Sequence, residues 1–327
     1  MDNFNSQNDE DLNQSPNQNR FDEELFPRMS PFKAGLLGLF GALVFYQLFG
    51  GLLTLLIFGT DIENADVNAM RLLTMAGQVL FILLPALVFS KMIYENVSKV
   101  IRVKIPELKE IGIFILGIIS LTALLQTFLV IQNYYVDALT KDIYFLQKFK
   151  EVFDQLNEMI EKSYGSLLTP NSFIEGIIVV LVVAVTPAIC EEVMFRGYIQ
   201  KSFELKYNKF LGALLTAVFF GMFHFNPYAL IPLIALGLFF GYAAYKTDSI
   251  FVPIILHFAN NFAAVILYFI FGDEELKQNK VIEAAELNSA WITFAFQLVL
   301  FVAILILIYQ FYKKRNLLTE TLQKNGG

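Results

Sequence analysis

The sequence predicts an all-α, polytopic membrane protein with about eight transmembrane helices. Of its 327 residues, 56% are hydrophobic, and the mean hydropathy is +0.55. The apolar residues form long blocks, and a block of about 18 or more is long enough to cross a bilayer as a helix. Most charges lie between these blocks. The formal net charge of −6 therefore says little about partners, and we expect no nucleic-acid surface.

Eight candidate spans follow one another along the chain. They are residues 34–58, 72–92, 111–131, 173–195, 209–226, 229–246, 250–271 and 290–312. The fifth and sixth are short and are separated only by a turn at Asn226-Pro227. We therefore divide the chain into a polar N-terminal tail (1–33), a helical membrane domain (34–313) and a short polar C-terminal tail (314–327). The first tail is expected to be disordered, because it has too few apolar residues to offset the entropy of ordering.

The longest polar segment inside the membrane domain, residues 132–170, predicts an amphipathic helix. Six apolar side chains recur in it at helical spacing: Phe149, Val152, Phe153, Leu156, Met159 and Ile160. A helix of this kind lies along a membrane surface with its apolar face toward lipid.

The basic residues predict the orientation of the chain. With the N-terminus inside, the cytoplasmic segments would hold 17 Lys and Arg residues and the outer segments 7. Cytoplasmic loops carry the excess of positive charge in membrane proteins. We therefore expect an integral protein of a bacterial inner membrane, with both termini in the cytoplasm.

The fourth span contains charges that are costly inside a bilayer. Glu191, Glu192 and Arg196 form the pattern Glu-Glu-x-x-x-Arg near its end. A charge at the centre of a membrane helix costs roughly 2.5–3.5 kcal/mol on insertion scales, and such residues are usually paired and functional. The alternative is a helix end at the interface, with Arg196 reaching water and the glutamates solvated.

Both histidines of the chain, His224 and His257, also lie in apolar spans. Phe220 precedes His224 by one helical turn, and Asn261 follows His257 by one turn on the same face. Glu191 lies 16 residues before the expected hairpin tip at Tyr207, and His224 lies 17 after it. At about 1.5 Å per residue both are roughly 25 Å from the tip. Glu191, the two histidines and Asn261 can therefore converge in a cavity that opens to the cytoplasm.

That set of side chains suits hydrolysis. A carboxylate in an apolar pocket can act as a general base, a neutral imidazole can hold a water, and an amide can donate to a developing oxyanion. Glu191, His224 and His257 could equally bind a divalent metal such as zinc with one open position. The chain contains no His-Glu-x-x-His motif, however, so the spacing does not require zinc.

Three short segments resemble the motifs of the CAAX protease and bacteriocin-processing family of intramembrane proteases. They are EEVMFR, FFGMFH and HFANN, which match Glu-Glu-x-x-x-Arg, Phe-x-x-x-His and His-x-x-x-Asn over roughly residues 173–271. The resemblance implies that Glu191 activates water with help from His224. It further implies that His257 and Asn261 position the water or stabilise the oxyanion. Glu192 and Arg196 would form an orienting ion pair. The expected substrate is a membrane-associated or lipidated peptide or protein.

Two other classes of protein remain open. A non-catalytic scaffold, a regulator or a proton-coupled transporter could use the same buried polar cluster. A thiol protease could use Cys190, the single cysteine, together with a histidine. Cys190 points about 100° away from Glu191 on a helix, and a lone cysteine in an apolar span is usually a small hydrophobic residue.

Overall fold

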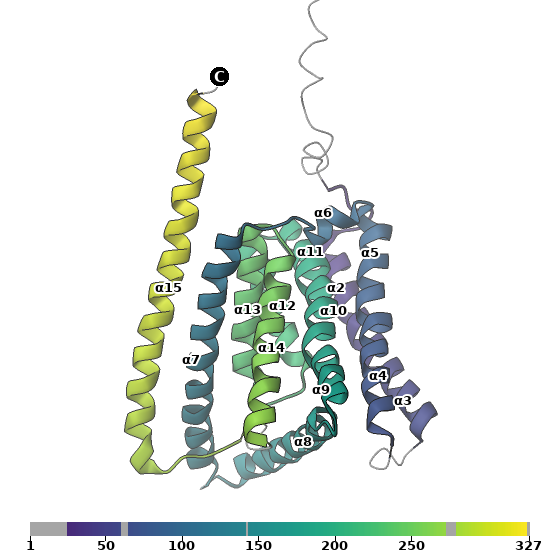
Figure 1. Ribbon diagram of the computed structural model, residues 1–327, viewed down its shortest axis with the longest axis vertical. Coiled ribbons are helices and arrows are strands. Elements are labelled where there is room, and N and C mark those ends of the chain that lie inside the picture. The colour runs from purple at the N-terminus through teal and green to yellow at the C-terminus, as the bar shows by residue number, and fades with distance from the viewer. Residues whose placement is uncertain (1–24, 60–64, 142, 273–278, 326–327) are drawn as a thin grey trace, which may run out of the picture.

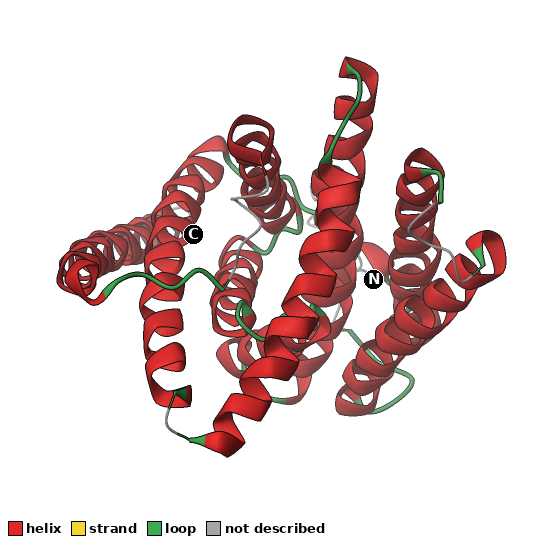
Figure 2. Cartoon of the chain, turned by 90° about the horizontal axis from the view of Figure 1, so that it is seen from below, coloured by secondary structure: helices red, strands yellow, loops and turns green. Residues whose placement is uncertain are grey.

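A computed structural model describes residues 25–59, 65–141, 143–272 and 279–325, and this part of the chain is a bundle of helices without strands (Figures 1 and 2). Residues 1–24 of the expected N-terminal tail lie outside the described residues. The helices are α2 (Pro31–Ala42), η1 (Leu43–Gly50), α3 (Gly51–Phe58), α4 (Val67–Gln78), η3 (Val79–Leu83), α5 (Leu84–Tyr94), α6 (Val97–Ile101), α7 (Leu108–Thr140), α8 (Tyr144–Leu168), α9 (Phe173–Val180), η4 (Leu181–Val185), α10 (Thr186–Glu192), η5 (Val193–Ile199), α11 (Gln200–Lys206), α12 (Lys209–Phe223), α13 (Leu230–Thr247), α14 (Phe251–Phe271) and α15 (Ala284–Asn325).

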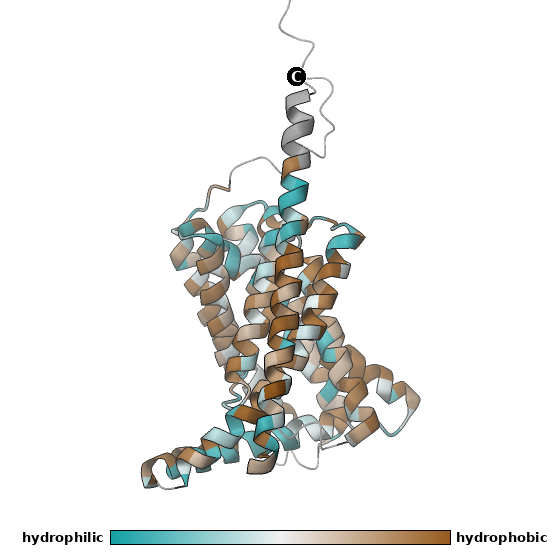
Figure 3. Cartoon of the chain, turned by 90° about the vertical axis from the view of Figure 1, so that its left-hand side faces the viewer, coloured by the Kyte–Doolittle hydropathy of each residue, from teal (hydrophilic) through white to brown (hydrophobic). Residues whose placement is uncertain are grey.

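All eight predicted spans are helices. Seven helical stretches of the described chain are long and apolar enough to cross a membrane, and the fifth, α12, is a shorter apolar helix of 15 residues. The hydrophobic residues cover the middle of the bundle and the hydrophilic residues gather toward its two ends (Figure 3). The fold is therefore that of an all-α integral membrane protein. The polar residues after 313 continue helix α15 as far as Asn325.

Contacts between distant segments define two ends of the bundle, which we call the α6 end and the α8 end (Figure 1). At the α6 end, Arg28 pairs with Glu95 after α5, and Arg315 of α15 pairs with Glu107 before α7. At the α8 end, Asn133 of α7 donates a hydrogen bond to the carbonyl of Lys280. Residues 28 and 315 thus lie at the same end, as an even number of crossings requires.

Four π-helical segments interrupt the long helices, and two of them have a simple cause. Segment η3 ends just before Pro85, and η4 ends just before Pro187. Proline lacks an N–H and its ring collides with the preceding turn, so the helix widens there instead of keeping its regular hydrogen bonds. The chain that carries Glu191 is therefore one long helix with a widened turn on each side of α10.

Glycines let helix α2 approach the chain that follows Glu192. A Cβ at Gly35 would lie 2.7 Å from the Phe203 ring, and a Cβ at Gly38 would lie 2.7 Å from the Tyr198 ring. Small residues permit such close approach of membrane helices. The Tyr198 hydroxyl also donates to the Ala34 carbonyl at 2.9 Å, which fixes α2 against η5.

The predicted amphipathic helix is α8, which lies across one end of the bundle (Figure 1). Its apolar side chains, including Phe149, Val152 and Met159, are exposed. A strip of polar side chains faces the bundle: Asn157 is buried, and Asp154 accepts a 2.5 Å hydrogen bond from the hydroxyl of Tyr228. Other polar side chains, such as Lys148 and Glu151, are exposed together with the apolar ones.

Candidate functional site

Glu192 lies at the centre of the candidate site. Its carboxylate is fully buried at the end of α10, and its Oε1 accepts hydrogen bonds from Arg196 Nη1 at 2.8 Å and from His257 Nδ1 at 2.7 Å. The pair with Arg196 spans one helical turn, the spacing at which charged side chains meet. The contact with His257 joins helix α14 to this pair, whereas the sequence led us to expect His257 beside Glu191.

Two phenylalanines enclose this charged group. The Arg196 guanidinium carbon lies 4.2 Å from the centre of the Phe220 ring and 5.3 Å from that of Phe240. The Phe240 ring also stacks on the His257 imidazole, with centroids 5.4 Å apart. Aromatic faces attract cations, so they help to stabilise a guanidinium that is held away from water. Phe220 thus has a direct structural role in the site.

Glu191 has no comparable partners. Its Oε2 atom is buried and accepts no hydrogen bond from the described residues. Tyr46 on η1 and Tyr164 on α8 are titratable neighbours of this carboxylate. Adjacent residues of a helix point about 100° apart. Glu192 is consequently held by Arg196 and His257, while no hydrogen bond joins the Glu191 side chain to another described residue.

His224 follows the last residue of α12. Its Nδ1 lies 2.7 Å from the Phe220 carbonyl oxygen, and its ring contacts the Phe220 ring with centroids 4.6 Å apart. A carbonyl can only accept, so the proton of this bond is on Nδ1. In the neutral imidazole Nε2 is then an acceptor. Phe220 also contacts His257, with centroids 6.1 Å apart, so both histidines lie on one aromatic ring.

Asn261 compensates for a hydrogen bond that Pro187 removes. Proline has no N–H to donate to the carbonyl four residues earlier, which here belongs to Val183. Asn261 Nδ2 donates to that carbonyl at 3.0 Å. The amide has two hydrogens, and the second has no acceptor among the described residues. One amide hydrogen of Asn261 thus holds α14 against η4, and the other is left to donate to a ligand.

We expect the stability that is lost in Asn261→Ala to depend on Pro187. Asn261→Ala leaves the Val183 carbonyl without its donor, which costs about 1–3 kcal/mol for a buried acceptor. In a Pro187→Ala background the restored N–H can satisfy that carbonyl. The same substitution should then cost less, with a coupling of about 0.5–3 kcal/mol between the two positions. Thermal unfolding of the two single variants and the double variant in detergent measures the coupling. Additive losses would contradict the assignment.

Further polar side chains extend the Glu192–Arg196 pair toward the α6 end. Gln200 and Glu204 follow Arg196 at intervals of four residues, and Gln200 Nε2 donates to Glu204 Oε1 at 2.8 Å. Arg102, after α6, pairs with the other oxygen of Glu204. Arg196, Gln200 and Arg102 are almost completely buried. The expected cavity opening toward the cytoplasm is thus filled on this face of the helix.

Two glycines of α13 make room for the buried side chains of Arg196 and Gln200. Arg196 Nη2 donates to the Gly237 carbonyl at 3.2 Å, and Gln200 Nε2 donates to the Gly241 carbonyl at 3.0 Å. A Cβ at Gly241 would lie 2.8 Å from Gln200 Oε1. We did not predict the roles of Gln200 and Glu204 from the sequence. They lie four and eight residues after Arg196, and this helical spacing is the signal that identifies them.

The residues do not fit the zinc alternative. Among the described residues, no three His, Cys, Asp or Glu side chains are grouped as metal ligands, and this holds for Glu191, His224 and His257. His257 directs Nδ1 at a carboxylate that also binds Arg196. Cys190, the residue of the thiol alternative, is buried in the apolar core between α2 and η5. No described histidine is paired with it.

Together the fold and the cluster define a polytopic membrane protein with an intramembrane Glu/His site. A family model described as "Type II CAAX prenyl endopeptidase Rce1-like" matches residues 173–263. That range runs from α9 into α14 and contains every side chain of the predicted site. This segment of the chain is therefore similar to the CAAX prenyl endopeptidase family, which agrees with the resemblance carried by its three motifs.

A curated bacterial protein supports the same assignment. The protein named "Putative membrane peptidase YdiL" of Bacillus subtilis (strain 168) is 31% identical over 90 residues, which make up 28% of this chain. The match spans 37% of that protein's length. No solved structure shows a significant match.

Proposed function

We propose that the protein is an intramembrane endopeptidase that hydrolyses a peptide bond of a membrane-associated peptide or protein with a water activated by glutamate and histidine. The single observation that carries this proposal is the unequal state of the two adjacent glutamates. Glu192 Oε1 binds both Arg196 and His257, and only its Oε2 has no partner, whereas neither a hydrogen bond nor an ion pair joins the Glu191 side chain to another described residue and its Oε2 is buried. The match of residues 173–263 to a CAAX endopeptidase family supports the reaction class.

In the proposed reaction Glu191 is the general base. It takes a proton from a water whose oxygen attacks the peptide carbonyl carbon. The acceptor Nε2 of His224 holds that water in place. The second amide hydrogen of Asn261 donates to the developing oxyanion. His257 directs its Nδ1–H at Glu192, so its Nε2 can join Asn261 as a donor only in the imidazolium form, which the carboxylate stabilises. Glu191 then returns the proton to the leaving nitrogen as the C–N bond breaks.

A cleavage assay tests the proposal against the alternatives. The purified protein, reconstituted in liposomes, is incubated with a set of membrane-anchored peptides, and the products are identified by mass spectrometry. A defined new pair of termini supports the peptidase. Proton-coupled substrate flux without cleavage would instead support a transporter, which is the main alternative use of a buried Glu/His cluster.

We expect the α6 end to lie in the cytoplasm of a bacterial cell. The segments that the sequence assigns to the inside hold 17 of the 24 basic residues, and those that the structure describes include Arg28 and Arg315 at this end. Positively charged loops stay in the cytoplasm. A reporter active only in the cytoplasm should work when fused after residue 327. A reporter fused in the loop between α14 and α15 should not. The opposite result would reverse the orientation.

A further inference from the structure

The loop between α12 and α13, residues 225–229, begins directly after His224. The last turn of α12 continues into this loop, because Phe225 N donates to the Met222 carbonyl at 3.1 Å. The His224 imidazole is bonded through Nδ1 to the Phe220 carbonyl of the same turn. The position of His224 therefore depends on how the loop leaves the helix.

Phe225 holds a backbone conformation that its side chain disfavours. Its φ is +51°, in the left-handed region where the Cβ of an L-residue crowds the following carbonyl oxygen. Glycine adopts this region freely, whereas a bulky aromatic residue rarely does. Such strain persists only where the surrounding contacts hold it, and it is concentrated at functional sites. The contacts that hold this loop therefore bear on His224.

Two other helices hold the loop through Tyr228. The Tyr228 side chain is buried, and its hydroxyl donates to Oδ1 of Asp154 on α8 at 2.5 Å. Its carbonyl accepts a hydrogen bond from Gln132 Nε2 on α7 at 2.9 Å. The other oxygen of Asp154 accepts from Lys150 at 2.8 Å, so the tyrosine donates to a paired carboxylate, and such charge-assisted bonds are strong. The loop is thus fixed only four residues after His224.

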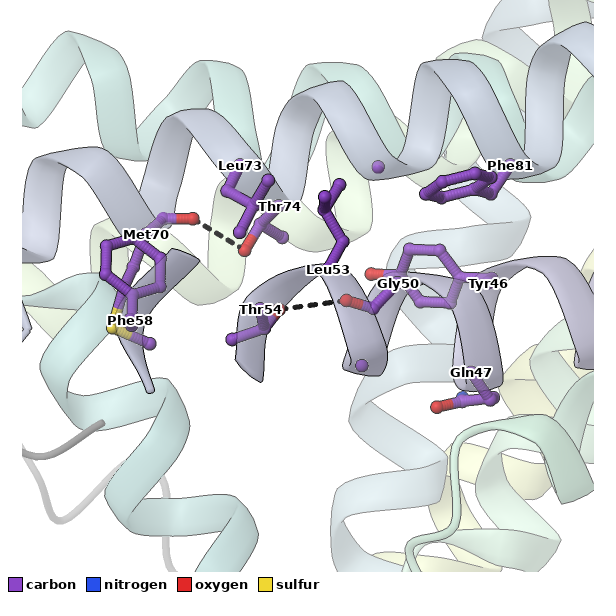
Figure 4. Close-up of a pocket in the computed structure, with 12 residues that line it drawn as sticks. Tyr46, Gln47, Gly50, Leu53, Thr54, Phe58, Met70, Leu73, Thr74 and Phe81 are labelled. Carbon is purple, nitrogen blue, oxygen red and sulfur yellow. Dashed lines mark hydrogen bonds between the residues drawn. The ribbon is translucent and has the colours of Figure 1, made fainter. Parts of the chain in front are cut away.

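This contact differs from the hydroxyl contacts in a cavity elsewhere in the bundle. A space of about 200 Å³ lies between the helix that contains η1 and α3 and the helix that contains α4 and η3 (Figure 4). Thr54 and Thr74 line it, and each donates to a carbonyl of its own helix, at 3.0 and 2.9 Å. Those bonds do not fix the two helices against each other. The bond between Tyr228 and Asp154 instead joins segments 74 residues apart in the chain.

We propose that Tyr228 and Asp154 are positioning residues for His224. Through them α8 holds the loop, keeps Phe225 in its left-handed conformation and fixes the Nε2 atom of His224 that holds the attacking water. The inference rests on the proposed peptidase function and adds two residues to it. Asp154 lies outside the residues 173–263 that match the family model, so that match assigns it no role.

Removal of one hydroxyl tests this pair. Tyr228→Phe deletes only the donor to Asp154, which keeps its contact with Lys150. Tyr312→Phe is the matched control, because the Tyr312 hydroxyl also donates to a carboxylate of another helix, Glu110 Oε1 on α7, at 2.8 Å. Each purified protein is assayed in liposomes on a membrane-anchored peptide that the parent protein cuts, and its melting temperature is measured in detergent.

We expect Tyr228→Phe to lower kcat by about 10-fold or more, because a small misplacement of a group that acts in catalysis is costly. KM should change little, since the water and not the peptide loses its position. Both tyrosine variants lose one hydrogen bond, so their melting temperatures should fall by similar amounts, but Tyr312→Phe should keep the parental kcat. A parental kcat in Tyr228→Phe, or an equal loss of kcat in Tyr312→Phe, overturns the proposal.

Phe225→Gly tests the route from this pair to His224. Glycine adopts a φ of +51° without the steric cost, so the loop then depends less on Tyr228. Tyr228→Phe should therefore lower kcat by a smaller factor in the Phe225→Gly background than in the parent protein. An equal factor in both backgrounds would mean that the pair does not act by holding Phe225, and the inference would be wrong.

Asp154 allows the same comparison from the other side of the hydrogen bond. Asp154→Asn keeps an oxygen that can accept from Tyr228 and should retain most of the activity, whereas Asp154→Ala should lower kcat as Tyr228→Phe does. A parental kcat in Asp154→Ala would overturn the proposal even if Tyr228→Phe failed to fold. If the parent protein cuts no peptide of the set, the peptidase function itself fails, and the inference falls with it.

Discussion

Glu191→Gln is expected to lower kcat/KM on a membrane-anchored peptide by about 10²–10⁴, the usual effect of removing a general base. The amide has nearly the same shape as the carboxylate, but it cannot take a proton from water. The Oε2 atom of Glu191 has no hydrogen-bond partner among the described residues, so the substitution breaks no bond that holds the fold. The melting temperature in detergent should therefore stay close to that of the parent protein.

Two neighbouring residues provide the controls for Glu191→Gln. Glu192→Gln weakens the contacts with Arg196 and His257, so it should lower both the melting temperature and the activity. Cys190→Ser should leave nearly full activity, because the thiol lies in the apolar core. A Glu191→Gln protein that cuts the peptide at the parental rate, or a dead Cys190→Ser protein, would refute the mechanism.

Arg196→Met is expected to destabilise the protein by about 3–5 kcal/mol, as breaking a buried ion pair does when one charge stays behind. The Glu192 carboxylate would keep only the His257 hydrogen bond in a place that is closed to solvent. The same change also removes the guanidinium between Phe220 and Phe240. Unfolding in detergent measures the loss of stability, and a cleavage assay run in parallel measures the loss of activity.

The exposed pair Arg28–Glu95 is the matched control for Arg196. Its side chains are 67% and 62% exposed, and such pairs contribute about 0–1 kcal/mol. Arg28→Met should thus change stability little. The double variant Glu192→Gln/Arg196→Met should be more stable than Arg196→Met alone, since no lone charge remains buried. Equal effects of Arg28→Met and Arg196→Met would show that Arg196 is a solvated interfacial residue.

The spans could be predicted, and candidate site residues could be selected, because the bilayer imposes simple rules. Length and hydropathy locate each spanning helix, and a charge inside such a helix is conspicuous because it is rare. The hairpin tip predicted at Tyr207 falls between α11 and α12. Short motifs and helix spacing then placed Glu191, His224 and His257 near one depth.

The partners within the site could not be predicted in the same way. Whether His257 meets Glu191 or Glu192 depends on how α14 is rotated against α10, and sequence spacing carries no information on that angle. The widened turns on either side of α10 also shift the direction of each later side chain. Asn261 is an example. We attribute its hydrogen bond to the Val183 carbonyl to Pro187, which lies on α10 whereas Asn261 lies on α14.

The inward polar strip of α8 limits the ways in which this helix can move. Rolling it about its own axis would turn Lys150 and Asp154 outward and bury the phenyl rings that now point away from the bundle. If the outer face of α8 lies on lipid, as the sequence led us to expect, that exchange would turn an ion pair toward the apolar side of the membrane surface, which is unfavourable. At its C-terminal end, Arg71 of α4 donates to the carbonyls of Leu167 and Thr169 at 2.9 and 2.7 Å. Tyr228 holds the middle of the helix through Asp154, so any tilt about the end held by Arg71 must first break that hydrogen bond.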